Sequence, residues 1–368
     1  MILFFQSRRD LGKYFTEVIR RGGFEGEIYT HKQFGLPSLA ALIKPDQDVI
    51  RTAVNYKLID KSSRRSQPAT ALQRFAYQLM ARFRYASDVA YLQQKRPELA
   101  VVWNGLKFRQ AIFVGAARSL GIKCCFMENG LLPDTTVCDE KGINAGNSLP
   151  RDADFYRSQE SLPAFTSKSL NVRAQVTDKI SGEGALPERY IFVPFQVDSD
   201  SQIVSYSPWI KNMAQLSQAV VDALPSDSPY KIVFKEHPSS YVDYDYLHTE
   251  IDNNKAMFAN GVATQTLIED ADAVITINST VGIEALSYGK KVIVLGEACY
   301  AIPEVVLCAS NQAELVNAIA CVGSVSFDSQ LREHFLAHLQ TQYHVQGDWR
   351  KPDEAHFESL ATRLKRFL

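Results

Sequence analysis

The chain alternates short apolar runs with longer amphipathic runs, and it does so in two separate stretches. Short apolar runs predict buried strands and amphipathic runs predict helices, so the alternation predicts parallel sheets covered by helices. The first stretch has predicted strands at 1–6, 26–31, 99–105 and 122–127 and predicted helices at 10–21, 72–96 and 108–121. The second has predicted strands at 190–197, 230–238, 273–279 and 290–296 and predicted helices at 208–224, 264–271, 280–289, 311–322, 326–342 and 352–367.

A long interruption separates the two stretches. From Glu128 to about Leu186, Gly, Asn, Pro, Asp and Ser dominate, and such a stretch is usually functional or disordered. Its apolar residues favour a functional role. Because 368 residues suit two domains better than one core, we predict an α/β fold of two Rossmann-like domains, 1–185 and 186–345, with a terminal helix in 346–368. Ligands of such folds bind beyond the carboxyl ends of the strands, which predicts an interdomain cleft.

The composition excludes several classes of protein. Forty basic and forty-one acidic side chains give a net charge of −1, which argues against a nucleic-acid partner. The six cysteines form no CxxC pair and have no histidine at ligand spacing, so we predict no metal site. No signal peptide and no apolar run of about 20 residues is recognisable. We therefore predict a soluble, cytoplasmic protein.

The segment 277–289 joins a predicted strand to a predicted helix. Ser279 or Thr280 can cap that helix, and its first N–H groups can bind an anion such as a nucleotide phosphate. An ordinary capped helix is the alternative. The candidates for donor binding here are Asn278, Ser279, Thr280, Gly282 and Glu284.

The segment KEHP ends another predicted strand of the second half. Lys235, His237 and Pro238 make a plausible phosphate-facing loop, in which His237 can donate to a phosphate or protonate the departing nucleotide. A lone histidine is more often structural or solvated. Two such segments about forty residues apart, each after its own strand, favour the functional interpretation.

Two carboxylates follow the strand at 190–197. Asp198 and Asp200 are either solvated turn residues or catalytic groups in a loop that faces the cleft, and alternation along an extended segment would put both on one side. Gln196, at the end of the same strand, is a further candidate for donor binding.

The first half has its own candidates at strand ends. Glu128 is either a catalytic base or a simple loop carboxylate. Arg8 and Arg9, after the first strand, can hold an anionic sugar or acceptor, or they are solvated surface arginines. Asn129 and Arg151 complete the candidates for substrate binding.

At these residues the chain resembles the bacterial capsule polysaccharide synthesis proteins, which are KpsC- and KpsS-like retaining β-Kdo glycosyltransferases, and the Kdo-transferase module of WbbB. The matching stretches, in order, are ENGLLPDTTVCDEKGINAGNSLPRDADFY, VPFQVDSDSQI, KEHP and NSTVGIEALSYGKKVIVLG. They lie within about residues 100–300, whereas 30–95 and 325–368 match nothing that would identify an acceptor.

The resemblance implies a GT-B-like pair of domains, with the acceptor on the first and the nucleotide sugar on the second. It implies CMP-Kdo, or another CMP-activated ulosonic acid, as donor, a glycan or lipid-linked acceptor, and neither metal nor other cofactor. It suggests Asp200 as nucleophile, Glu128 in the active site, and His237, Ser279 and Thr280 at the CMP phosphate. The alternatives are another GT-B-like enzyme, such as a UDP-sugar transferase or an epimerase, and a non-catalytic module of a polysaccharide assembly complex.

The last helical segment suggests a peripheral contact with the inner membrane. Phe357, Leu360, Leu364, Phe367 and Leu368 can share one face beside basic residues, as in helices that lie on anionic lipid. The alternative is that this helix packs on the first domain.

Overall fold

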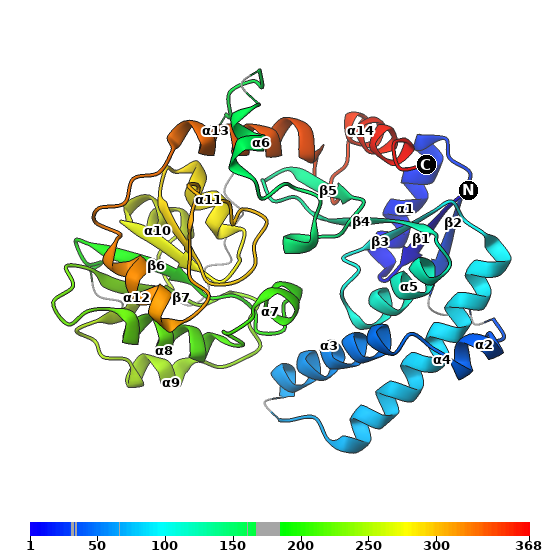
Figure 1. The fold of residues 1–368 in the computed structure, drawn as a ribbon, viewed down its shortest axis with the longest axis horizontal. Coiled ribbons are helices and arrows are strands. Elements are labelled where there is room, and N and C mark those ends of the chain that lie inside the picture. Colours follow the sequence, from blue (N-terminus) through cyan, green and yellow to red (C-terminus); the bar gives the residue numbers. More distant parts are fainter. Residues whose placement is uncertain (31–32, 34, 66, 160, 167–184) are drawn as a thin grey trace. The chain divides into compact units, whose positions relative to one another are not determined.

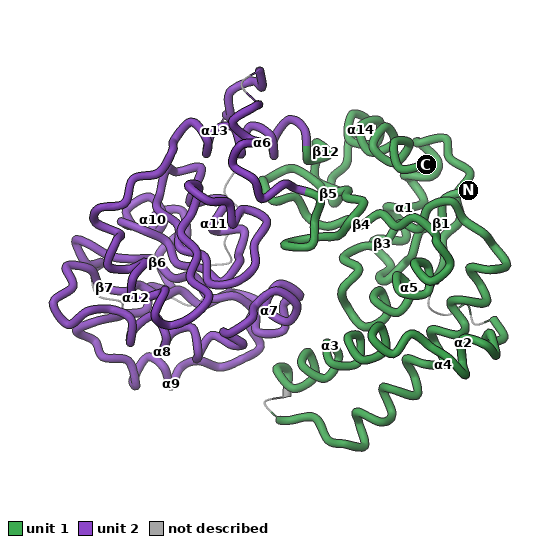
Figure 2. The backbone as a smooth tube through the Cα atoms, in the orientation of Figure 1, with its two compact units in different colours: residues 1–148, 343–368 green, residues 149–342 purple. Residues whose placement is uncertain are grey.

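The computed structural model describes residues 1–30, 33, 35–65, 67–159, 161–166 and 185–368. It divides into unit 1, residues 1–148 with 343–368, and unit 2, residues 149–342 (Figure 2). These boundaries differ from the predicted ones at 185/186 and 345/346. The segment that follows 148 joins unit 2, and the chain returns to unit 1 at its end.

Unit 1 is built on a sheet of strand order β12-β5-β4-β3-β1-β2 (Figure 1). Its strands are β1 (Ile2–Gln6), β2 (Gly26–Thr30), β3 (Leu99–Trp103), β4 (Lys123–Asn129), β5 (Thr135–Asp139) and β12 (Val345–Gln346). The strands β1 to β4 are parallel, as predicted. The strands β5 and β12 pair antiparallel, and β5 lies in the stretch for which no regular structure was expected. Only Val137 and Cys138 are apolar among its five residues, so β5 lacks the apolar run by which the other strands were recognised.

The helices of unit 1 are α1 (Arg9–Gly22), α2 (Leu39–Ile43), α3 (Gln47–Arg65), α4 (Ala71–Lys95), α5 (Phe108–Ser119) and α14 (Glu354–Lys365). The sequence did not predict α2 and α3. None of the α2 side chains is buried, so α2 has no apolar face directed into a core that a pattern could reveal. The helices α3, α4 and α5 pack on one another.

The terminal helix α14 packs on α1. Phe357, Leu360 and Leu364 lie in one core with Leu11 and Phe15. The apolar face of α14 is therefore buried within unit 1, and the expectation that this face meets lipid is wrong.

Unit 2 is built on a parallel sheet of strand order β11-β10-β9-β6-β7-β8. Its strands are β6 (Tyr190–Pro194), β7 (Lys231–Lys235), β8 (Ala256–Phe258), β9 (Ala273–Thr276), β10 (Lys291–Val294) and β11 (Leu307–Cys308). Its helices are α6 (Ala153–Arg157), α7 (Ser201–Tyr206), α8 (Met213–Ala223), α9 (Asp245–Glu250), α10 (Thr264–Asp270), α11 (Val281–Ser287), α12 (Gln312–Ala320) and α13 (Ser329–His338).

One helix of unit 2 begins later than predicted. The sequence placed its start at Pro208, but α8 begins at Met213, because the Asn212 side chain caps it by accepting the N–H of Gln215 at 2.8 Å. Asparagine is among the best N-cap residues. The segment from Pro208 to Asn212 is a loop instead.

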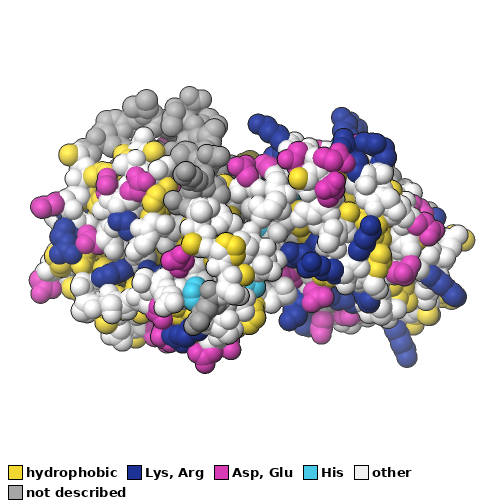
Figure 3. Space-filling view, turned by 90° about the horizontal axis from the view of Figure 1, so that it is seen from above, with side chains coloured by type: hydrophobic (Ala, Val, Ile, Leu, Met, Phe, Trp, Pro, Cys, Tyr) yellow, Lys and Arg dark blue, Asp and Glu magenta, His cyan; other side chains and the backbone are white. Residues whose placement is uncertain are grey.

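Lys and Arg side chains are interspersed with Asp and Glu on the face drawn in Figure 3, in keeping with the net charge of −1. Among the described residues, no helix is both long and apolar enough to cross a bilayer. The cytoplasmic location and the absence of a nucleic-acid partner stay predictions, and so does the interdomain cleft.

Candidate functional site

The sheet of unit 2 has its topological switch point between β6 and β9. From β6 the chain continues to β7 and β8 on one side, and then to β9, β10 and β11 on the other. Where the strand order reverses in this way, the connections leave a crevice beyond the carboxyl ends of the two strands, and ligands bind there. The loops that follow β6 and β9 carry the predicted motifs at 196–200 and 278–284.

A buried pair of amides joins these two loops. Gln196 Nε2 donates to Asn278 Oδ1 at 3.1 Å, and the N–H of Asn278 faces Gln196 Oε1 at 3.3 Å. The Asn278 amide also donates to the carbonyls of Gln202 and Tyr206. Both side chains are almost fully buried, so this pair holds the two loops together beneath the surface.

The loop after β9 is held by hydrogen bonds within itself and by a contact with Tyr300. Thr280 is the N-cap position of α11, while the hydroxyl of Ser279 accepts the N–H of Val281 at 3.2 Å. Tyr300 donates to the carbonyl of Ser279 at 2.5 Å. A Cβ on Gly282 would lie 2.4 Å from the Tyr300 hydroxyl oxygen, so only glycine fits there. Glu284 is half-buried in the first turn of the helix.

The two carboxylates after β6 lie in different surroundings. Asp198 is 9% exposed; it accepts the Tyr244 hydroxyl at 2.7 Å and the N–H of Met213 at 3.1 Å. Burial raises the pKa of Asp198 above its ordinary value, and these two hydrogen bonds oppose that rise. Asp200 is exposed and caps α7, with its carboxylate 2.8 Å from the N–H of Gln202.

The backbone explains this difference. The N–H of Asp200 donates to the carbonyl of Val197 at 2.8 Å, which closes a turn. An extended segment would have placed both carboxylates on one side, and that expectation is wrong. The turn commits Asp198 to the interior, where it anchors the start of α8, and leaves Asp200 at the surface.

The KEHP loop follows β7, which pairs with β6 on the side away from β9. The Lys235 ammonium donates to the carbonyls of Asn260 and Val262, so it braces the loop after β8. His237 is exposed, and its Nδ1 accepts the N–H of Ser239 at 3.1 Å. The neutral imidazole then carries its proton on Nε2, where it can donate. Pro238 is exposed beside it.

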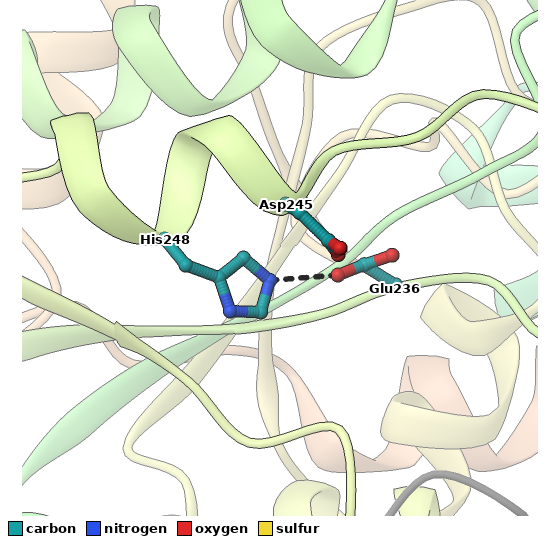
Figure 4. Close-up of side chains that lie close together, drawn as sticks. All are labelled: Glu236, Asp245 and His248. Atoms are coloured by element: carbon teal, nitrogen blue, oxygen red, sulfur yellow. Dashed lines mark hydrogen bonds and ion pairs between the residues drawn. The ribbon is translucent and has the colours of Figure 1, made fainter. Parts of the chain in front are cut away.

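Within the described part of the chain, Glu236, Asp245 and His248 have ligand-type atoms within 4.8 Å of one another (Figure 4). His248 Nε2 lies 2.7 Å from Glu236 Oε1, and its ring stacks on Phe258 at 3.9 Å. Asn260 also donates to Glu236. These contacts explain the cluster as an anchor between α9 and the KEHP loop. The expectation that no metal takes part stays a prediction.

In unit 1 the strand order reverses between β1 and β3. Asn104 directly follows β3, has a positive φ of 67°, and is 4% exposed. Its Nδ2 donates to Glu128 Oε2 at 2.9 Å, while Glu128 Oε1 accepts the N–H of Asn129 at 3.0 Å. Asn104 was not among the predicted site residues, although the Asn-Gly pair at a strand's carboxyl end is a signal that could have identified it.

Trp349, from the end of the chain, completes this edge of unit 1. Its Nε1 donates to Asn129 Oδ1 at 2.8 Å, and its ring lies 4.6 Å from that of Trp103. The guanidinium of Arg8 lies 5.5 Å from the Trp349 ring, and it also pairs with Asp10. The sequence did not predict a role for Trp349. Arg9 is exposed in the first turn of α1.

The segment after β5 is ordered by one buried carboxylate. Asp139 accepts the N–H groups of Lys141, Gly142 and Ser148 and the hydroxyl of Tyr343. This network holds the stretch 141–148, which contains a short 3-10 helix at Asn144–Gly146. Beyond it, Arg151 donates to the carbonyl of Leu149 and belongs to unit 2, not to the first domain as predicted.

Two surface cavities lie at the opposite, amino-terminal edges of the sheets. One has a volume of about 630 Å³ and is lined by residues such as Pro97, Glu98 and Lys123, before β3 and at the start of β4. The other, of about 440 Å³, is lined by residues including Arg189 and Tyr230, just before β6 and β7. Neither contains a predicted site residue, so their position does not favour them as reaction sites.

Comparison with known proteins places these features in context. Residues 171–344 match the model of the family "Capsule polysaccharide biosynthesis protein". Protein FixF of Sinorhizobium fredii is 36% identical, with 78% of this chain and 71% of FixF covered. The capsule polysaccharide export protein KpsS of Escherichia coli is 26% identical, with 50% and 63% covered.

Among solved structures, the β-Kdo 2,7 transferase of KpsC from Thermosulfurimonas dismutans superposes with a TM-score of 0.50 at 16% identity, covering 98% of each chain. This similarity confirms the predicted fold class of two Rossmann-like domains, as found in GT-B proteins.

Proposed function

Since the chain belongs to the capsule polysaccharide biosynthesis family, we propose that it is a retaining glycosyltransferase. It moves Kdo, or a related ulosonic acid, from a CMP-activated donor to a glycan or lipid-linked acceptor of a surface polysaccharide. The reaction proceeds by double displacement through an adduct on Asp200.

The buried hydrogen bond between Gln196 and Asn278 at the β6–β9 switch point is the observation that carries this proposal. This bond joins the motif after β6 to the motif after β9, 82 residues further along the chain. Ligands of such folds bind beyond the carboxyl ends of the strands at the switch point. An exposed carboxylate in the loop after β6 suits a nucleotide sugar whose reacting carbon must be held against it.

In the first displacement, Asp200 attacks the anomeric carbon. A bond forms between its carboxylate oxygen and that carbon, and the bond from the carbon to the CMP phosphate oxygen breaks, with its electron pair leaving on CMP. Asp200 is suited to this step because it is exposed. Asp198 is not, because its oxygens already accept the Tyr244 and Met213 hydrogen bonds.

The departing phosphate needs hydrogen-bond donors. His237 Nε2 is the proposed donor from the KEHP loop, and the Ser279 and Thr280 hydroxyls are the proposed donors from the loop after β9. Charge-assisted hydrogen bonds of this kind are typically worth about 1.5–3 kcal/mol each.

In the second displacement, an acceptor hydroxyl attacks the adduct and releases Asp200, which restores the original configuration. Glu128 is the proposed base that takes the hydroxyl proton. Its hydrogen bonds with Asn104 and with the Asn129 N–H fix the orientation of its carboxylate.

Calorimetry with CMP and UDP tests the donor class, and incubation with CMP-Kdo and candidate acceptors, followed by NMR of the product linkage, tests the reaction. We expect CMP to bind and UDP to bind much more weakly, and the double variant His237→Ala, Ser279→Ala to lose CMP affinity several-fold. Preference for UDP would replace the proposal by a UDP-sugar enzyme. Absence of nucleotide binding would leave a non-catalytic role in polysaccharide assembly.

A further inference from the structure

An exposed apolar surface in unit 1 has no role in the proposed reaction. We propose that it docks on an anionic lipid bilayer. This α2–α4 surface is defined by Leu39, Ile43, Leu72, Phe75, Leu79 and Phe83.

The first half of α4 contributes a continuous apolar stripe. Leu72, Phe75, Leu79 and Phe83 are 76%, 58%, 51% and 48% exposed. Their spacing of three, four and four residues places them on one side of the helix. The surface-facing stripe of a helix in a globular protein is normally polar, and here it is apolar.

The other side of α4 is already packed. Ala81 and Tyr85 are buried, and the Tyr77 ring meets the edge of Phe108 at 5.8 Å. Figure 1 shows α3 and α4 side by side as a hairpin, in agreement with their contacts. The exposed stripe is therefore a second apolar face on a helix whose packing face is satisfied.

The helix α2 extends this surface. It contacts α4, and the N–H of Ser38 donates to the carbonyl of Ala86 at 3.0 Å. Ala86 continues the side of α4 that carries Leu79 and Phe83. On α2 itself, Leu39 and Ile43 are 70% and 65% exposed.

The charge around this surface determines what it can bind. Residues 39–96 contain eleven Lys and Arg against four Asp and Glu, a net charge of +7 in a chain of net charge −1. Three of the four acids form ion pairs within the segment: Asp48 with Arg51, Asp60 with Lys57 and Arg64, and Asp88 with Arg84. Lys95 pairs with Glu27 outside it. Apolar side chains amid a basic surplus match a bilayer that carries anionic headgroups.

A second copy of the chain is a poorer occupant. In a symmetric dimer the same surface would face itself, so two segments of charge +7 would approach each other and repel. Bilayer docking also does not rest on the proposed function, because it is measured without donor or acceptor.

Vesicle flotation tests the docking. The wild-type chain is expected to float with vesicles of phosphatidylcholine and phosphatidylglycerol at low salt, and less with phosphatidylcholine alone or at high salt. The variant Phe75→Ser, Leu79→Ser, Phe83→Ser should bind about tenfold or more weakly. The variant Lys44→Glu, Arg51→Glu should lose the preference for phosphatidylglycerol.

The matched control is Tyr241→Ser with Val316→Ser, which removes exposed apolar side chains from unit 2 and should leave flotation unchanged. Circular dichroism checks that each variant is folded; if the triple variant does not fold, the charge variant decides. Failure of the wild type to float, or unchanged flotation of the folded variants, would overturn the proposal. So would a wild-type dimer that the triple variant dissociates, because a second copy would then cover the surface.

Discussion

The two sheets each have a topological switch point, but the residues that lie there are held in different ways. At the β6–β9 crevice of unit 2, Gln196 and Asn278 come from the loops that follow the two strands themselves. In unit 1, Asn104 follows β3 and donates to Glu128 of β4, and Trp349 donates to the neighbouring Asn129 from 220 residues further along the chain.

We therefore expect substitutions at the two switch points to have separate effects. The Gln196–Asn278 pair joins two loops of the unit 2 sheet, so its defects should appear in donor binding. The strand ends of unit 1 depend on Trp349 from the end of the chain, so defects there should appear in stability and in the use of the acceptor. The predictions below test that separation.

The largest effect is expected for Asp200→Asn. Asparagine caps a helix as well as aspartate does, so α7 and CMP binding should be retained, while transfer should fall about 1,000-fold or more. Intact-mass spectrometry of the active enzyme should show an adduct one sugar heavier, mapped to Asp200. An adduct on Asp198 instead would refute the assignment.

A smaller effect is expected for Glu128→Gln in unit 1. We expect a loss of about 100-fold, the lower end of what removal of a general base costs, in the step that uses the acceptor. Adduct formation and CMP affinity should stay normal, so the adduct should accumulate. Rates of adduct formation and of transfer, measured separately, check this; equal loss in both would mean that the two edges do not act separately.

Trp349→Phe should loosen unit 1 alone. It removes the hydrogen bond to Asn129 and part of the packing on Trp103, and we expect a loss of about 1–3 kcal/mol in the free energy of unfolding. Thermal unfolding measures the loss, and calorimetry should show unchanged CMP affinity. Weakened CMP binding in the folded variant would contradict the separation.

The smallest effect is expected for Asp198→Asn, within about 1 kcal/mol at neutral pH because asparagine can still accept the Met213 N–H. Burial raises the pKa of Asp198 in the folded protein, so its stabilising contribution is full below the ordinary value of 3.8 and is lost as pH rises through the folded pKa. The stability of the wild type relative to Asp198→Asn should therefore fall as pH rises. Urea unfolding of both proteins, from below pH 3.8 to neutral pH, checks the sign. A rise in the relative stability of the wild type with pH would contradict the prediction.

The sequence by itself determined the elements whose apolar faces meet a core. The strands β1, β3, β6 and β9 appeared as short apolar runs, because burial on both faces leaves almost no polar position in them. The motifs at their carboxyl ends were also recognisable, because parallel strands bring their ends to one edge of a sheet wherever the strands lie in the chain.

Only the tertiary structure decided the rest. The turn at Val197 separated Asp198 from Asp200, and long-range contacts brought Trp349 to Asn129 and buried the apolar face of α14. Two helices, α4 and α14, carry similar amphipathic patterns, yet one stripe is exposed and the other is in the core. A pattern records which side of a helix is apolar, but what that side meets depends on residues far away in the chain.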